Sequence, residues 1–205
     1  MTHRFAELMF TPAVQAWQQA EGSRESYARF TQPRFPARDR LTQGEIDHIS
    51  TRDSFYIASV SETGWPYVQH RGGTPGFLKV IDDRTLAFAE YSGNQQYVTF
   101  GNLGGDDRVS LFLMDYPKRR RLKILAHARV IDPDHDSGSL QQLSEDGEMP
   151  QRGVVLSLEG FDWNCPKYIT PRFTLGELAP LQARLEALEA ENTALRDRLA
   201  STGLS

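Results

Sequence analysis

The chain has 205 residues, of which 39% are hydrophobic, enough for one substantial core with appendages but not obviously for two full domains. Its formal net charge of −4 argues against a general nucleic-acid-binding protein. A single cysteine, Cys165, excludes an intramolecular disulfide bond and favours a reducing compartment. No run approaches the roughly 20 apolar residues of a membrane-spanning helix, and the polar N-terminal residues do not match a secretion signal, so we expect a cytoplasmic protein without a membrane partner.

The first fifty residues predict short helices joined by an extended arm. Threonine followed by proline at 11–12 is a favoured helix start, and the glycine at 22 should end this helix. Ser23 then caps a second short helix, and residues 31–40, with two prolines, are expected to be extended. The sequence TQGE at 42–45 matches a capping box and predicts a third helix, which leads into the first strand.

Most of the remaining chain alternates with the period of β-strands. Phe55 to Val60 alternate before turn residues at 62–64, which predicts a hairpin whose second strand leaves at Pro66 and breaks at the glycines that begin with Gly72. Six or seven short strands that close on themselves favour a barrel. The other expected strands are residues 77–81, 85–89, 108–114, 122–131 and 154–158.

Three polar segments within these strands predict an anion site. The second strand carries Gln69 and Arg71, and SGNQQY at 92–97 precedes an expected helix whose unpaired N–H groups and dipole favour a phosphate. On the strand from 122, Arg121 and Lys123 lie on one face, while the apolar side chains lie on the other.

The segments FYIASVSETGWPYVQHRGG, FAEYSGNQQY, RVSLFLMDYP and RRRLKILAHARV resemble the split-barrel, FMN-binding proteins related to pyridoxamine 5'-phosphate oxidase, over residues 55–130. The resemblance implies a mainly β fold with flanking helices (α+β), a split β-barrel, and FMN in a groove at a homodimer interface. Where the oxidase has an Arg-Lys pair after its loop, this chain has two glutamines. By position, the flavin contacts would be Gln69, His70, Arg71, Gly72, Ser92, Gly93, Asn94, Gln95, Gln96, Arg121 and Lys123.

The segment FDWNCPKYITPRFT at 161–174 concentrates aromatic and polar residues without a period. Trp163 is therefore a candidate flavin contact, and the alternative is a tail that packs on the barrel. The oxidases hold their vitamin B6 substrate with an Arg-x-His pair near the C-terminus. This chain offers Arg172-Phe173-Thr174 there, so the resemblance does not extend to vitamin B6 oxidation.

The last segment has a heptad repeat. Leucines at 178, 185 and 199 and Asn192 occupy the a positions, and leucines at 181, 188 and 195 occupy d. A lone asparagine at a is typical of a parallel two-stranded coiled coil, and the alternative is a helix folded back on the barrel. We therefore expect N-terminal helices and an arm at 1–53, a flavin-binding barrel at 54–174 and a coiled-coil helix at 175–205.

The sequence lacks several familiar catalytic motifs. Its five histidines and one cysteine show no metal-ligand spacing, and no nucleophile elbow, P-loop or dinucleotide fingerprint is present. This pattern suits an enzyme whose cofactor supplies the reactive atoms, namely an FMN-dependent oxidoreductase acting on a small molecule. The alternatives are a flavin- or haem-binding module without turnover, or a deazaflavin (F420)-dependent reductase.

Overall fold

The computed structural model describes residues 3–32, 35–132, 134, 136–144 and 148–201. The chain forms two compact units, the first from residues 1–115 and 120–167 and the second from residues 116–119 and 168–205. None of the helices in these described ranges is both long and apolar enough to cross a membrane.

The first unit is built on a seven-stranded antiparallel sheet with the strand order β2-β1-β5-β6-β7-β4-β3. All the predicted strands are confirmed, although β3 is reduced to two residues. β7 continues to Trp163, so residues 161–163 belong to a strand rather than to a non-periodic segment. The strands are β1 (Ser54–Val60), β2 (Pro66–Gly72), β3 (Lys79–Val80), β4 (Thr85–Glu90), β5 (Arg108–Asp115), β6 (Arg120–Ile131) and β7 (Arg152–Trp163).

Short helices flank the sheet, and capping residues explain where some of them begin. Ser23 is the N-cap residue of the helix at 24–28, but its side chain makes no capping hydrogen bond. Thr11 accepts a hydrogen bond from the backbone of Val14, and Thr42 and Glu45 form the predicted capping box. One helix was not predicted from the sequence, because six residues at 4–9 are too few to show a period. The helices are α1 (Arg4–Met9), α2 (Pro12–Ala20), α3 (Arg24–Ala28), the 3₁₀ turn η1 (Arg29–Thr31), α4 (Gln43–Ser50), α5 (Val98–Gly105) and α6 (Ser137–Gln142).

The acidic segment after β6 contains the short helix α6, and part of this segment lies outside the described residues. Asp136 caps α6 by accepting a hydrogen bond from the backbone of Ser139 at 3.1 Å. A polar cap therefore starts this helix, although the segment has too few apolar residues to continue it.

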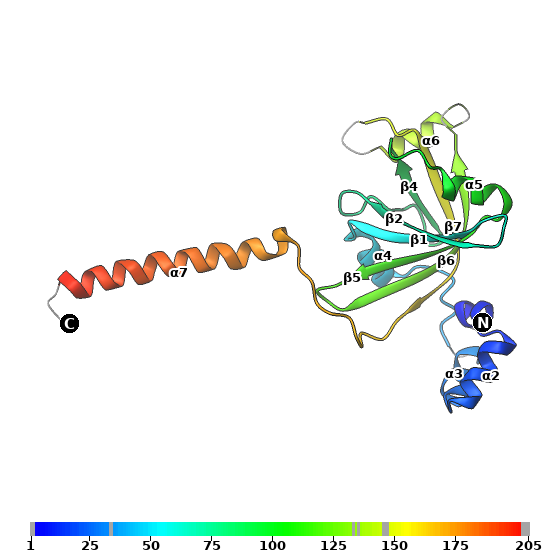
Figure 1. Ribbon diagram of the computed structural model, residues 1–205, viewed down its shortest axis with the longest axis horizontal. Coiled ribbons are helices and arrows are strands. Elements are labelled where there is room, and N and C mark those ends of the chain that lie inside the picture. The colour runs from blue at the N-terminus through cyan, green and yellow to red at the C-terminus, as the bar shows by residue number, and fades with distance from the viewer. Residues whose placement is uncertain (1–2, 33–34, 133, 135, 145–147, 202–205) are drawn as a thin grey trace. The chain divides into compact units, whose positions relative to one another are not determined.

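The core lies inside the curved sheet, which wraps around it so that strands distant in the strand order approach each other (Figure 1). Alternate residues of β1, β5 and β6 point inward, as their period of two predicts. The ring of Phe77, which precedes β3, stacks on that of Phe55 in β1 with centroids 5.4 Å apart. An ion pair between Arg71 and Glu90 also joins β2, at one end of the strand order, to β4, which lies next to the other end. This closure positions the candidate site.

The second unit contains the 27-residue helix α7 (Leu175–Ser201). Thr174 caps it, because its hydroxyl accepts from the backbone of Glu177 at 3.2 Å and the Glu177 carboxylate accepts from the backbone of Thr174 at 2.8 Å. The predicted helix is confirmed, and no residue of α7 is buried.

Candidate functional site

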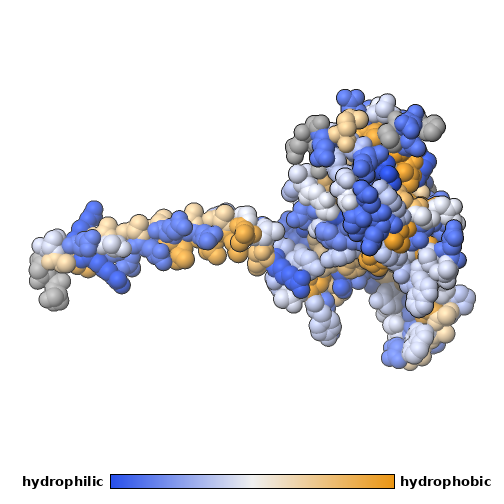
Figure 2. Space-filling view, turned by 45° about the horizontal axis from the view of Figure 1, so that its top comes forward, coloured by the Kyte–Doolittle hydropathy of each residue, from blue (hydrophilic) through white to orange (hydrophobic). Residues whose placement is uncertain are grey.

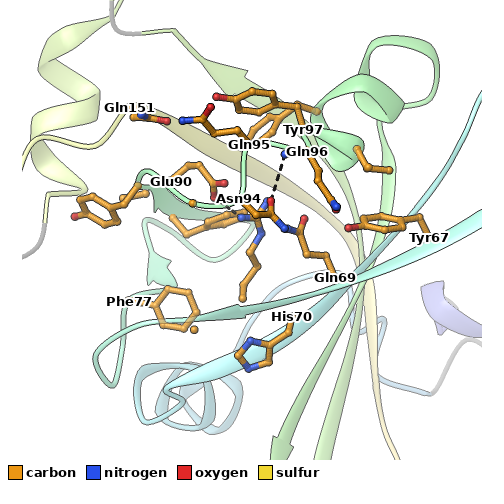
Figure 3. Close-up of a pocket in the computed structure, with 18 residues that line it drawn as sticks. Tyr67, Gln69, His70, Phe77, Glu90, Asn94, Gln95, Gln96, Tyr97 and Gln151 are labelled. Carbon is orange, nitrogen blue, oxygen red and sulfur yellow. Dashed lines mark hydrogen bonds and ion pairs between the residues drawn. The ribbon is translucent and has the colours of Figure 1, made fainter.

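A cavity of about 350 Å³ lies where β2, the end of β4, and the loop from 91 to 97 meet the start of α5 (Figure 3). The structure brings together here eight of the predicted contacts from two separate segments. Ser92 belongs to the same loop but does not line the cavity. The predicted residues that do line it are Gln69, His70, Arg71, Gly72, Gly93, Asn94, Gln95 and Gln96.

The loop reaches α5 through two residues with left-handed backbone, Gln95 (φ 58°) and Tyr97 (φ 53°). The side-chain oxygen of Asn94 accepts from the backbone of Gln96 at 3.3 Å, a local bond that stabilises such a turn. Tyr97 is the N-cap residue of α5, and it makes no side-chain capping hydrogen bond. The positive end of this helix is therefore left without a side-chain cap beside the cavity.

Arg71 is the cation of the cavity, and its charge is already paired. Its guanidinium bonds to the Glu90 carboxylate, and the two side chains are only 12% and 17% exposed. The same guanidinium lies 5.8 Å from the ring centroids of Phe88 and Phe100. Its Nε is buried and has no hydrogen-bond partner among the described residues. Arg71 is thus held firmly, with one donor unused.

Gln69 and His70 leave β2 on opposite sides, as neighbouring strand residues do (Figure 3). The side-chain amide oxygen of Gln69 accepts a 2.8 Å hydrogen bond from the Thr99 hydroxyl of α5. This bond fixes the amide and leaves its nitrogen to donate. The ring of His70 instead meets that of Tyr56 edge to face, with centroids 5.6 Å apart.

The other three predicted contacts, Arg121, Lys123 and Trp163, line a second cavity of about 790 Å³. Its walls are the helices of residues 3–30 and the adjoining parts of β6 and β7, and it shares no lining residue with the first cavity. Within one chain, therefore, these three residues do not join Gln69 and Arg71.

Each of these three side chains has neighbours of its own. Lys123 lies 3.2 Å from the Asp162 carboxylate, and Arg121 donates to the backbone oxygen of Cys165 at 3.3 Å. The Trp163 indole donates to the Glu45 carboxylate at 2.6 Å, and the guanidinium of Arg120 lies 4.4 Å from its ring. Trp163 is thus packed into the barrel wall, and its role as a flavin contact stays a prediction.

The structure adds lining residues that sequence reasoning missed. Tyr67 shares the face of Gln69 and Arg71, so the period of two in β2 could have identified it. Glu90 stands next to the predicted loop, but only the sheet's closure places it on Arg71. No local signal marks Phe77 or Gln151, because each reaches the cavity from a distant part of the chain.

His48 of α4 is a buried titratable group outside both cavities. It is 4% exposed, its Nε2 lies 3.4 Å from the Leu113 carbonyl oxygen, and its ring packs edge to face on Trp163. Burial, assisted by the positive charge of Arg52, lowers its pKa to about 4, so the ring is neutral near pH 7. Within the described ranges, no group of three His, Cys, Asp or Glu residues could hold a metal ion.

Comparison with known proteins places this geometry in a family. Residues 45–159, more than half of the chain, match the pyridoxamine 5'-phosphate oxidase family. No curated protein matches the sequence. HupZ of Group A Streptococcus superposes with a TM-score of 0.50 at 13% identity, covering 65% of this chain and 99% of that one. A putative pyridoxamine 5'-phosphate oxidase from Lactobacillus delbrueckii gives a TM-score of 0.49 at 22% identity, with coverages of 60% and 94%. At such identities the structural likeness shows the fold alone, whereas the sequence match shows the family. The chain therefore belongs to the pyridoxamine 5'-phosphate oxidase family, and its curved sheet is a split β-barrel.

Proposed function

We propose that this protein is an FMN-binding oxidoreductase that works as a homodimer, with the flavin in the cavity of about 350 Å³. The observation that carries the proposal is the convergence of β2 with the loop before α5. Eight residues that were predicted from the family resemblance, in segments 20 or more positions apart, line one cavity. Membership of the family supports the same reading.

The side chains around the cavity suit a flavin ring. The pyrimidine edge of a flavin carries both hydrogen-bond donors and acceptors, and amide side chains offer both. Gln69 has a fixed amide, and the loop supplies Asn94, Gln95 and Gln96. The cavity volume is at the low end of the usual 300–1,000 Å³ for ligand sites, so a second subunit would be needed to cover the rest of the cofactor.

The phosphate gives a physical reason for the homodimer. Arg71 is paired with Glu90, and the loop has glutamines where the oxidase has Arg-Lys, so the residues that line this cavity in one chain offer little net positive charge. Arg121 and Lys123 line a different cavity of the same chain. If they contact the flavin phosphate, they do so from the second copy.

When bound, the flavin would supply the hydride-accepting and hydride-donating group, and the chain's residues would bind the ring and exclude water around it. This division of roles fits a site that has amides and aromatic rings but no nucleophile with an adjacent base among its lining residues. The substrate is a small molecule other than the vitamin B6 compounds, because the Arg-x-His pair is replaced here.

The decisive experiment is titration of the purified protein with FMN, followed by anaerobic addition of NADH or NADPH. We expect tight binding with quenched flavin fluorescence, and then bleaching of the bound flavin. Binding without bleaching by either nucleotide would leave a flavin-binding module without turnover. Failure to bind FMN, together with binding of haem or of deazaflavin, would overturn the cofactor assignment.

A further inference from the structure

The helix α7 carries a hydrophobic stripe that the other described residues of its own unit do not cover. Hydrophobic side chains follow the length of this helix (Figure 2). The leucines at a and d are 37–68% exposed: Leu178, Leu181, Leu185, Leu188, Leu195 and Leu199. A single helix in water is marginally stable when no packing supports it. We propose that α7 pairs with α7 of a second copy as a parallel, in-register two-stranded coiled coil, a contact that does not depend on the flavin.

The charges beside the stripe complement a second copy. In a parallel pair, Arg184 at position g faces Glu189 at e of the other helix, and Glu191 at g faces Arg196 at e. None of these four side chains forms an ion pair with another of the described residues, so all are available. Both contacts are attractive, and two-fold symmetry repeats each of them.

Charge alone does not fix the direction of the two helices. In the antiparallel alignment that places Asn192 opposite Leu181, Arg184 faces Glu191 of the other helix, which is also attractive. Asn192 distinguishes the two arrangements. The parallel pair places the two Asn192 amides opposite each other, where they hydrogen-bond, whereas the antiparallel pair leaves each amide facing a leucine without a partner. The sequence therefore favours the parallel pair.

Disulfide trapping in the full-length protein tests the direction. In a Cys165→Ser background, Leu195→Cys places a thiol at d, and Ala190→Cys places one at f on the outer face as a matched control. In the parallel pair the two Cys side chains at 195 meet and cross-link under mild oxidation. In the antiparallel pair residue 195 faces residue 178 of the partner, and its equivalents lie roughly 25 Å apart, at about 1.5 Å per residue. We expect efficient cross-linking at 195 and at least 10-fold less at 190.

Charge reversal in the Leu195→Cys, Cys165→Ser protein gives a second, independent readout. Glu191→Arg should slow the cross-linking several-fold, because it faces Arg196 of the partner. Adding Arg196→Glu should restore the rate, while adding Arg184→Glu should not. Rescue by Arg184→Glu instead, or equal cross-linking at 195 and 190, would overturn the parallel pairing. A protein that forms no cross-link at 195 while its helix content is intact would show that the stripe meets something other than a second copy.

Discussion

Arg71 of β2 and Glu90 of β4 form an ion pair between strands that lie far apart in the strand order, at the wall of the candidate flavin cavity. The pair has two opposing effects, one on the stability of the fold and one on phosphate binding. It helps to join the two ends of the curved sheet, and it neutralises the cation that a phosphate would need. A ligand phosphate must therefore share the Arg71 guanidinium with Glu90, or contact a different positively charged side chain.

The first prediction concerns this pair. Arg71→Met alone should lower the free energy of unfolding by about 3–5 kcal/mol, because it leaves the largely buried Glu90 carboxylate without its partner. The double variant with Glu90→Gln should recover most of that loss. Denaturant unfolding measures the free energies of the single and double variants.

If Arg71 holds the phosphate, the double variant should bind FMN roughly 10- to 150-fold more weakly than the parent, for a charge-assisted bond of about 1.5–3 kcal/mol. Riboflavin affinity should be nearly unchanged, and an equal loss for both ligands would contradict the phosphate contact.

The second prediction tests the cavity itself. A Cβ at Gly93 meets nothing within 4 Å, and its backbone does not require glycine. Gly93→Leu should therefore fold but fill the cavity, and weaken FMN binding at least 10-fold.

Gly138 provides the matched control, because a Cβ there also meets open space and the residue lies outside the cavity in α6. Gly138→Leu should bind FMN like the parent. Equal affinities for the two variants, measured by flavin fluorescence, would place the flavin elsewhere.

The third prediction tests whether two chains share one flavin. An Arg121→Gln, Lys123→Gln chain and an Arg71→Met, Glu90→Gln chain should each bind FMN weakly as homodimers. Co-expressed with different tags and purified as a heterodimer, they should recover one tight site per dimer. In one of the two sites, Arg71 and Glu90 of one chain then meet Arg121 and Lys123 of the other, and all four are unaltered. Isothermal titration gives the number of sites. A heterodimer with no tight site would mean that both sets of residues act within one chain. Tight binding by either homodimer would mean that its altered set does not act.

The fourth prediction follows from His48. Its pKa is about 4 in the folded chain and about 6.5 when unfolded, so the unfolded chain binds the extra proton between these values. The contribution of His48 to the free energy of unfolding is therefore fully present above about pH 6.5. It is lost as the pH falls toward 4, which lowers the free energy of unfolding by about 3 kcal/mol in total.

The pKa of His3 is also lowered, first by burial and then by the nearby Arg38. His3 therefore contributes in the same direction. His48→Gln should thus flatten much of the slope of stability against pH between 6.5 and 4, and His3→Gln a further part. Urea midpoints across this range provide the measurement. An unchanged slope in His48→Gln would show that the ring can be protonated without leaving its site, and would contradict the assignment.

The fifth prediction contrasts two glycines. Gly76 has a φ of +84°, and a Cβ there would lie 2.8 Å from the Ser50 carbonyl oxygen, so Gly76→Ala should lower the melting temperature by several degrees. Gly101 lies within α5, where a Cβ meets nothing, so Gly101→Ala should stabilise the protein by about 0.5–1 kcal/mol. Calorimetry decides both signs. A stabilised Gly76→Ala variant would mean that the turn before β3 relaxes freely.

The sequence by itself determined the parts of this protein that depend on near neighbours. Alternation with a period of two located the strands, a threonine-proline pair and a capping box located the starts of α2 and α4, and spaced leucines located α7. The same local pattern placed Gln69 and Arg71 on one face of β2. These features are set within a few residues, because backbone hydrogen bonding and side-chain direction are local. The six-residue α1 was missed, because so short a helix shows no period.

Only the tertiary structure decided which of these segments meet. The pairing of Arg71 with Glu90 depends on how far the seven-stranded sheet curves, and this curvature is the sum of packing along every strand. The same closure brings the loop before α5 onto β2 and leaves Arg121 and Lys123 in a separate cavity lined by the N-terminal helices. No local pattern encodes such distances, because side chains from distant segments share a site only after the core has fixed the strand order.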